Sequence, residues 1–511
     1  MLARTILMCL ALQLVVVLAG VETAAVGSEG PAAAEPRARP GRRPNILFCI
    51  SDDQSCHDAG AYGSKMVRTP AFDHIAREGI LFTNVFTSNP TCAPSRASVL
   101  TGQAFYRLEE GASNWGTLDR KFPVFPDMLE KAGYAIGYTG KGWGPGDWAA
   151  GGRNRDPAGP AFHKRRCKPP TTGISACDYA GNFADFLKTR KPAQPFYFWY
   201  GGLEPHRPYE VGSGLKAGKK LAEAEVPPFL LDAPPVRLDL LDYALEIEWF
   251  DTHLARMIKM LEEARELDNT IVIVTSDNGM PFARAKGRSY DAGTHEPFAV
   301  RWGSHIKRGR VVTDFVSFTD IAPTLLKAAG LEPLPKMTGK SFLDVLLSGK
   351  SGRVDASRDH VIAGRERFYP TLLPYPFRVL RTDQYLYIRN FKPERNPEDL
   401  PPGFDPAEAG PSVQYMFSRR HGNAHEQCIN KLCLGKLPAE ELYNLKNDRW
   451  EMRNVANEER LAADKKALAA RLEAELKRTG DPRILGGGDV FDSYPTRVFH
   501  ERTLSGLTEV P

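Results

Sequence analysis

The chain has 511 residues, of which 42% are apolar and 25% are charged, and its formal net charge is +5. This composition is that of an ordinary globular protein and excludes a chain that is disordered throughout. A net charge this small for the length also argues against a nucleic-acid-binding protein, so we expect no nucleic acid among its partners.

Residues 1–25 read as a secretory signal peptide, with Arg4 before an apolar stretch at 6–18 and small residues at 23–25. A membrane anchor is the alternative, but an apolar run of about 13 residues is shorter than the roughly 20 that span a bilayer. We therefore expect export to a periplasmic, extracellular or other oxidising compartment, with no transmembrane segment in the mature chain. Residues 26–43, rich in Ala, Pro and Arg, are predicted to form a flexible leader.

Two continuous apolar runs each end in oxygen-bearing side chains. The run 45–51 precedes Asp52 and Asp53, and the run 269–276 precedes Asp277 and Asn278. Such runs are typical of strands buried on both faces, and ligands usually bind at the carboxyl ends of such strands. The pattern predicts that these four side chains meet at one edge of a sheet.

Helical and strand patterns alternate between and beyond these runs, which predicts an α/β fold with a large mixed, mostly parallel sheet flanked by helices over residues 44–359. Helices are expected at 69–78, 125–132, 238–267, 315–326 and 341–347, and further strands at 135–139 and 195–200.

The pattern changes near residue 360. Segments 378–381 and 384–389 alternate apolar and polar residues as an exposed antiparallel hairpin does, 440–445 reads as a strand, and 458–478 as an amphipathic helix. We predict a smaller α+β domain at 360–485 and a tail at 486–511.

Segment 92–96, with the sequence CAPSR, has the features of an anion site. A helix is expected to begin at Ser95, just after a proline, which places Cys92 ahead of its N-terminus. Free N–H groups and the helix dipole favour an anion there, and Arg96 adds a two-pronged cation.

This segment, continued by Leu100-Thr101-Gly102, resembles the signature of the type I sulfatases, which are formylglycine-dependent members of the alkaline-phosphatase-like superfamily. The resemblance implies an alkaline-phosphatase-like fold, oxidation of Cys92 to formylglycine by a maturation enzyme, and attack by the hydrated aldehyde. A buried or disulfide-bonded cysteine in a turn is the alternative. Six cysteines remain when Cys9 is removed with the signal peptide and Cys92 is modified. Cys167 and Cys177 are close enough in sequence to close a small loop, and so are Cys428 and Cys433. The disulfide pairing stays open.

Asp52, Asp53, Asp277 and Asn278 form an oxygen-only ligand set of the kind that Ca²⁺ or Mg²⁺ prefers. Aspartates capping a strand-end turn would explain the first pair alone. The second pair behind a second buried strand favours a metal, and the resemblance implies Ca²⁺, with Mg²⁺ possible.

The resemblance also assigns the remaining catalytic roles. Arg96, Lys141 and Lys286 correspond to residues that hold the sulfonate oxygens, and His206 to the histidine that protonates the leaving group. The assignment of Lys286 can slip to its neighbours Arg284 or Arg288.

The chain departs from the family pattern at Trp143, where the family carries a histidine. His57 follows Asp52 closely and is one candidate to replace it, although a plain loop residue is the simpler interpretation. His295 is expected near the rim of the site.

Within the family, segments 204–207, 275–282 and 373–378 are closest to the heparan N-sulfatase (sulfamidase) branch. We therefore expect a sulfatase that removes sulfate esters or sulfamates from a sulfated carbohydrate, with N-sulfoglucosamine as first choice. Glu204, Arg378 and Arg381 are the expected substrate contacts. A phosphonate monoester or phosphodiester hydrolase and a non-catalytic sulfated-glycan-binding protein are the alternatives.

Overall fold

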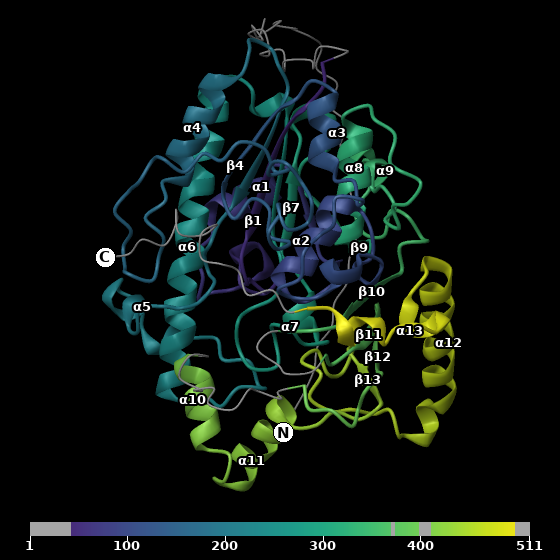
Figure 1. The fold of residues 1–511 in the computed structure, drawn as a ribbon. Helices are drawn as coiled ribbons and strands as arrows, with labels where there is room; N and C mark the ends of the chain where they lie inside the picture. Colours follow the sequence, from purple (N-terminus) through teal and green to yellow (C-terminus); the bar gives the residue numbers. More distant parts are fainter. Residues whose placement is uncertain (1–41, 369–373, 398–409, 496–511) are drawn as a thin grey trace, which may run out of the picture. The chain divides into compact units, whose positions relative to one another are not determined.

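The computed structural model describes residues 42–368, 374–397 and 410–495 (Figure 1). The predicted signal peptide, the leader up to residue 41 and the tail beyond residue 495 lie outside the described residues. Among the described residues, no helix combines the length and the apolar character needed to cross a bilayer.

A seven-stranded sheet forms the centre of the fold, in the order β4-β5-β1-β6-β7-β2-β8. Its strands are β1 (Asn45–Ser51), β2 (Ile80–Phe82), β4 (Ala135–Gly140), β5 (Phe196–Gly201), β6 (Thr270–Ser276), β7 (Phe298–Arg301) and β8 (Arg310–Val312). All neighbours pair in parallel except β7, which is antiparallel to both β6 and β2. The predicted mixed, mostly parallel sheet is confirmed.

Helices cover both faces of this sheet (Figure 1). One layer holds α1 (Pro70–Arg77), α4 (Tyr179–Thr189) and α6 (Pro234–Glu263), and the other holds α2 (Cys92–Thr101), α3 (Phe125–Lys131), α8 (Ile321–Ala328) and α9 (Leu343–Leu347). Alternate residues of β1 enter the two cores, because successive strand side chains point to opposite faces. Ile46 and Phe48 pack under α2 and α3, and Leu47 under α4 and α6, each burial contributing about 1.5–3 kcal/mol.

The expected elements are found with shifts of a few residues. The long helix expected at 238–267 begins four residues earlier, at Pro234, since proline suits a first helical turn. The helix expected at 315–326 is shorter, because its first residues form the strand β9 (Val316–Ser317), which pairs with β3 (Val85–Phe86). The remaining short helices are α5 (Ser213–Lys216), α7 (Asp291–Thr294), α13 (Pro482–Leu485) and α14 (Val490–Ser493).

A second, antiparallel sheet follows, in the order β10 (His360–Arg365), β11 (Phe377–Thr382), β12 (Tyr385–Asn390) and β13 (Glu440–Asn444). The helix α12 (Ala462–Thr479) packs on β11 and β12. Two helices that the sequence patterns did not predict, α10 (Pro411–Ser418) and α11 (Ala424–Leu434), lie between β12 and β13 in the chain. Residue 360, the predicted domain boundary, is the first residue of β10, and we keep the division at that point as a proposal.

The cysteines of the described residues are all free thiols. Cys428 and Cys433 lie on one helix, where Cys433 is buried and its thiol donates to the Phe229 carbonyl at 3.0 Å, while Cys428 is exposed. The Cys167 sulfur lies 3.7 Å from the carbonyl oxygen of Cys177 rather than against its sulfur. Neither small loop is closed by a disulfide.

Arg378 corrects the expectation of an exposed hairpin. It lies on β11, inside the four-stranded sheet, and is fully buried. Its Nη2 donates to Glu366 Oε1 at 2.6 Å, and its Nε to Asp481 Oδ2 at 2.5 Å. A guanidinium enclosed between two carboxylates does not reach a substrate, so the substrate-binding role predicted for Arg378 is wrong.

We expect Arg378→Ala to lower the free energy of unfolding by about 3–5 kcal/mol, because it leaves Glu366 and Asp481 buried without their cation. Arg389, paired opposite Arg378 on β12, is the matched control: its side chain is 41% exposed and lies 3.7 Å from Glu473. Arg389→Ala should change stability by less than about 0.5 kcal/mol. Denaturant unfolding measures both. A stable Arg378→Ala protein with a raised KM for a sulfated oligosaccharide would restore the rim role.

Candidate active site

The register of β1 and β6 brings the four predicted metal ligands together. The two strands are parallel neighbours, and Ser51 pairs with Ser276 at their carboxyl ends. The residues that follow, Asp52 and Asp53 on one strand and Asp277 and Asn278 on the other, therefore leave the sheet at the same level. All four are buried.

Hydrogen bonds fix these side chains and leave two oxygens unused. Asn278 donates its amide to Asp53 Oδ1 at 2.8 Å, and the Asp53 backbone N–H donates to Asp277 Oδ1 at 3.1 Å. Asp53 adopts the left-handed conformation, with φ of 77°, that this turn requires. The remaining Asp52 Oδ1 and Asn278 Oδ1 are buried with no hydrogen-bond partner in the described part of the chain. Buried acceptors without donors suit a hard cation such as Ca²⁺ or Mg²⁺, so the residues present fit a divalent metal.

Three carboxylates packed this closely perturb one another. Burial alone would raise the pKa of Asp52, but the Lys141, His206 and Arg96 charges hold that pKa well below its usual range. Burial and the negative charge of Asp52 raise the pKa of Asp277 to about 7. Three carboxylates therefore lie together at this edge of the sheet, where their negative charge would stabilise a divalent ion. Asp52, Asp53 and His206 also place ligand atoms within 4.8 Å of one another.

Cys92 is the first residue of α2, three residues earlier than the helix start expected from the sequence. Every later residue of α2 is buried, whereas Cys92 is partly exposed. The helix N-terminus therefore presents its free N–H groups and its dipole beside the one accessible side chain of the helix. The amide of Asn114 also faces the cysteine, with Nδ2 at 3.8 Å from Sγ.

Three cations link this helix to the carboxylates. Arg96 Nε lies 2.8 Å from Asp277 Oδ2, Lys141 Nζ 2.5 Å from Asp52 Oδ2, and Lys286 Nζ 2.7 Å from Asp53 Oδ2. Burial lowers the pKa of Lys141, Arg96 and Lys286, but the carboxylates and a negative charge at Cys92 raise it to a greater extent, so all three stay protonated. The structure thus brings the predicted nucleophile, metal ligands and sulfonate-binding cations into one site.

Arg96 is held tightly in place. Its guanidinium is fully buried and also donates to the Lys141 carbonyl at 3.0 Å. A Cβ at Gly144 would lie 2.4 Å from Arg96 Cδ, and Gly144 has φ of +88°, so only glycine allows this loop to approach the arginine.

His206 also reaches the site. The ring Nδ1 lies 2.7 Å from the Arg207 carbonyl, which accepts a hydrogen bond only if Nδ1 carries a proton, and this leaves Nε2 directed at Asp53 Oδ2, 3.8 Å away. Its side chain is 43% exposed, so Nε2 borders both the carboxylates and solvent. Desolvation and the Lys286 charge lower the pKa of His206.

Glu204 does not take the predicted substrate-binding role. Its side chain is buried and accepts from the Ser175 N–H and the Tyr179 hydroxyl, both at 2.9 Å, and burial raises its pKa to about 7. Its carbonyl oxygen accepts from the Asp52 N–H at 3.1 Å. Glu204 therefore anchors the His206 loop to the end of β1 and leaves no free group for a sugar.

Arg381 is likewise occupied, because its guanidinium makes a bidentate pair with Asp291, with Nη2 at 2.8 Å from Oδ2. The prediction that it binds substrate is wrong for the same reason as that for Arg378. The alternatives to Lys286 also point elsewhere: Arg284 and Arg288 donate to the carbonyls of Leu432 and Cys433 on α11. Lys286 is the basic residue of this segment that pairs with Asp53.

No histidine that we considered replaces the one lost at Trp143. Trp143 is buried in the core, with the Arg153 guanidinium 5.0 Å from the centre of its ring. His57 packs against Trp450 and His295. His295 stacks on Phe86, and its Nε2 lies 2.9 Å from the Thr83 carbonyl. The polar group that the structure does place at Cys92 is Asn114, in a loop whose sequence gave no signal of its role.

Comparison with known proteins agrees with this site. The sequence model of the sulfatase family matches residues 44–331, more than half of the chain, and an ulvan-active sulfatase of Formosa agariphila is 31% identical over 447 residues, covering 86% of this chain and 81% of the relative. The chain belongs to the sulfatase family. The predicted enzyme class, a sulfuric ester or sulfamate hydrolase, is confirmed by this membership.

Other matches of this sulfatase extend over the C-terminal part. The model of the N-sulphoglucosamine sulphohydrolase C-terminal region matches residues 285–401. The human N-sulphoglucosamine sulphohydrolase is 26% identical over 487 residues, covering 89% of this chain and 94% of the relative.

Solved structures confirm the alkaline-phosphatase-like fold. One, in complex with its substrate D-glucosamine-2-N,6-O-disulfate, superposes with a TM-score of 0.65 at 20% identity, over 86% of this chain and 99% of that one. A phosphonate monoester hydrolase of Agrobacterium radiobacter gives a TM-score of 0.64 at 19% identity, over 87% of this chain and 97% of that one.

We expect Asn114→Ala to lower kcat at least about tenfold with the melting temperature unchanged, because a preorganised donor beside the nucleophile is lost. Asn84→Ala is the matched control, since Asn84 donates its amide to the carbonyl of Thr313, just after β8, at 2.9 Å. Steady-state kinetics on an aryl sulfate measures both. If kcat is the same in Asn114→Ala and in the parent, Asn114 has no role in the reaction.

Proposed function

We propose that this sulfatase removes the N-sulfate of a glucosamine residue in a sulfated glycan, using a formylglycine formed from Cys92. The observation that supports the reaction is that Arg96, Lys141 and Lys286 all lie close enough to Cys92, at the start of α2, for a negative charge there to raise their pKa. The choice of sugar is supported by the match of residues 285–401 to the C-terminal region of N-sulphoglucosamine sulphohydrolases.

The protein side chains supply binding and charge stabilisation. The ammonium groups of Lys141 and Lys286 each pair with a carboxylate, and a negative charge at Cys92 raises the pKa of both, so they suit the oxygens of a sulfonate group at that position. Buried Arg96 donates to the Lys141 carbonyl and holds that loop. Charges fixed in advance stabilise the transition state without reorganising during the reaction. Asp52, Asp53, Asp277 and Asn278 would hold a Ca²⁺ ion. When bound, that ion supplies a further positive charge that polarises the sulfonate oxygens.

A formylglycine at position 92 would supply a hydrated aldehyde, one hydroxyl of which would serve as the nucleophile at sulfur. The helix N-terminus and the Asn114 amide border this position and favour negative charge on its oxygen. Over the full reaction one water is consumed, its oxygen ends on the released sulfate, and the sugar leaves as an amine.

His206 supplies the proton of the leaving group. With Nδ1 bound to the Arg207 carbonyl, Nε2 is the ring atom that can carry and donate a proton. The S–N bond of a sulfamate breaks readily only if the departing nitrogen is protonated, so a donor at the exposed side of the site is required. The same geometry serves the oxygen of a sulfate ester.

We also propose export through the N-terminal segment and maturation by a formylglycine-generating enzyme. Both follow from the sequence of residues 1–25 and from the signature at Cys92.

Turnover of two sugars tests the substrate. N-sulfoglucosamine should release sulfate, and glucosamine 6-sulfate should be turned over at least about tenfold more slowly, a difference of 1.4 kcal/mol in transition-state binding. Release from the 6-O-sulfated sugar alone would overturn the choice of an N-sulfate. Turnover of an aryl phosphodiester is measured in parallel. A phosphonate monoester or phosphodiester hydrolase, the alternative, would turn over this compound faster than any sulfated sugar.

The nucleophile is tested by mass and by substitution. The peptide that contains Cys92, from protein made in its native host, should show an aldehyde in place of the thiol. Cys92→Ala should fold normally, because it changes little volume at a partly exposed site, and should lose all measurable turnover. An unmodified thiol in active protein, or turnover by Cys92→Ala within about tenfold of the parent, would assign the chemistry to another residue.

Metal removal is expected to abolish activity, and Asp277→Asn should reduce bound Ca²⁺ measured by elemental analysis. The substitution keeps the shape of the side chain and an acceptor for the Arg96 N–H, so the loss follows from the missing charge. Asp268→Asn, at a side chain that is 59% exposed and pairs with Arg301, is the control that should keep both metal and activity. Full activity after exhaustive chelation would contradict the metal assignment.

A further inference from the structure

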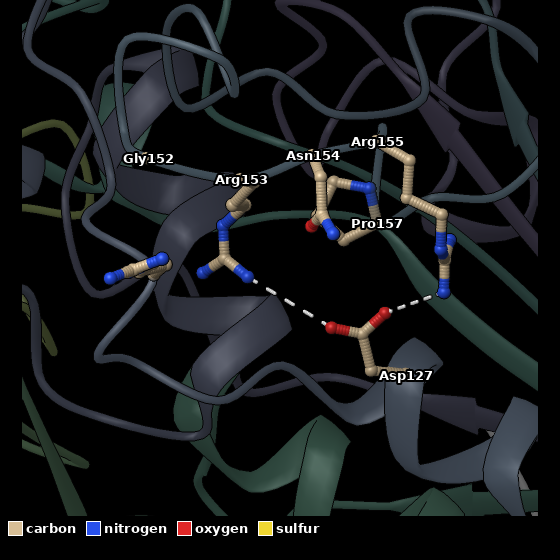
Figure 2. A pocket seen from close by; sticks show the side chains of 7 residues that line it. Asp127, Gly152, Arg153, Asn154, Arg155 and Pro157 are labelled. Carbon is tan, nitrogen blue, oxygen red and sulfur yellow. Dashed lines mark hydrogen bonds and ion pairs between the residues drawn. The ribbon is translucent and has the colours of Figure 1, made fainter.

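A cavity of about 340 Å³ lies outside the site described above, between the first turn of α3 and the loop at 152–157 (Figure 2). It is lined by Arg120, Asp127, Gly152, Arg153, Asn154, Arg155 and Pro157. This volume is at the small end of the range of ligand pockets, which suits one sugar unit rather than a large ligand.

The lining is strongly basic. Arg155 pairs with Asp127 at 2.9 Å and also with Glu130, and Arg153 lies 3.9 Å from Asp127 (Figure 2). Arg120 is exposed, and its guanidinium has no hydrogen-bond or ion-pair partner among the described residues. Arg153 and Arg155 thus have carboxylate partners, and Arg120 is the cation of this lining whose charge is available to an anionic ligand.

Arg153 is built into the wall of the cavity. Its side chain is only 8% exposed, and its Nη2 donates to the Phe122 carbonyl at 2.8 Å and to the Asp119 carbonyl at 3.3 Å. The face of its guanidinium lies over Trp143, while its buried Nε has no hydrogen-bond partner within the described ranges. The guanidinium of Arg153 is thus a rigid cation in the same lining as the exposed Arg120, and two arginines of this kind suit an oxyanion ligand.

We propose that this cavity binds an acidic sugar of the glycan chain, through its sulfate or carboxylate, at a unit other than the one being hydrolysed. The choice of a glycan rests on the proposed function. The arginines recognise the planar or tetrahedral oxyanion, and the Asn154 amide and the Asp127 carboxylate suit sugar hydroxyls, which need acceptors as well as donors. A bare inorganic anion would gain nothing from Asp127, which repels it.

The cavity and the catalytic site share one segment of chain. Lys141, which pairs with Asp52, begins the segment, and Arg153 and Arg155 end it. Trp143, which stands where the family has a histidine, is the residue on which Arg153 rests. A chain bound at the cavity therefore lies against the loop that carries a sulfonate-binding lysine.

Arg120→Ala tests the proposal, because Arg120 is exposed and its removal does not disturb the core. The matched control is Arg68→Ala, at another exposed arginine without a side-chain partner among the described residues. With a heparin-derived octasaccharide at low salt, Arg120→Ala should raise KM about threefold to tenfold, and kcat/KM for the N-sulfoglucosamine monosaccharide should not change. The effect should vanish at about 1 M NaCl, where charges are screened within about 3 Å.

A binding measurement separates this proposal from the proposed reaction. In the Cys92→Ala background, which prevents turnover, calorimetry should show the same threefold to tenfold weakening of octasaccharide binding by Arg120→Ala and none by Arg68→Ala. If the octasaccharide binds in this way but no sulfated sugar is turned over by the parent, the reaction is wrong and the cavity assignment stands. If sugars are turned over and Arg120→Ala matches Arg68→Ala in both assays, or weakens inorganic sulfate as much as octasaccharide, the cavity assignment is overturned.

Discussion

The active site depends on the parallel pairing of β1 with β6. Because Ser51 and Ser276 are in register, three carboxylates and one amide leave the sheet together and are buried at one edge. Such a concentration of negative charge is stable only with cations beside it. Arg96 from α2, Lys141 from the end of β4 and Lys286 from the loop after β6 supply them. The charge of the proposed metal ligands therefore also positions the residues that we propose bind a sulfonate.

The C-terminal sheet contributes to the site indirectly. Arg378 bridges Asp481 and Glu366, and the residues next to Glu366 lie against the catalytic loops: Arg365 donates to the Gly287 carbonyl, and the Arg367 carbonyl accepts from the Asn114 N–H at 3.2 Å. The buried arginine thus fixes the segment that borders Lys286 and Asn114. Its role is to position the wall of the site, and the stability of the sheet becomes a condition for the geometry at Cys92.

The sequence predicted those parts of the site that a residue pattern within one short segment indicates. A buried strand followed by acidic residues, or a cysteine before a small-residue helix, can be read without knowing the fold, and the register of β1 and β6 then brought these residues together as expected. Arg378 and Arg381 were misassigned because alternation along a strand does not reveal that α12 and α7 cover it. Asn114 was missed because its loop has no periodicity and its contact with Cys92 arises only from tertiary packing.

The burial of α2 bears on whether the proposed oxidation of Cys92 comes before or after folding. From Ala93 to Thr101 each residue of this helix is enclosed, and Arg96 is bonded to Asp277 across the site. A maturation enzyme that recognises the residues around Cys92 as an extended strand would have to extract the central helix of the domain, at a cost comparable to unfolding it. If the proposed oxidation of Cys92 requires that extended form, it precedes folding, and a chain that folds first keeps an unmodified thiol at the start of α2.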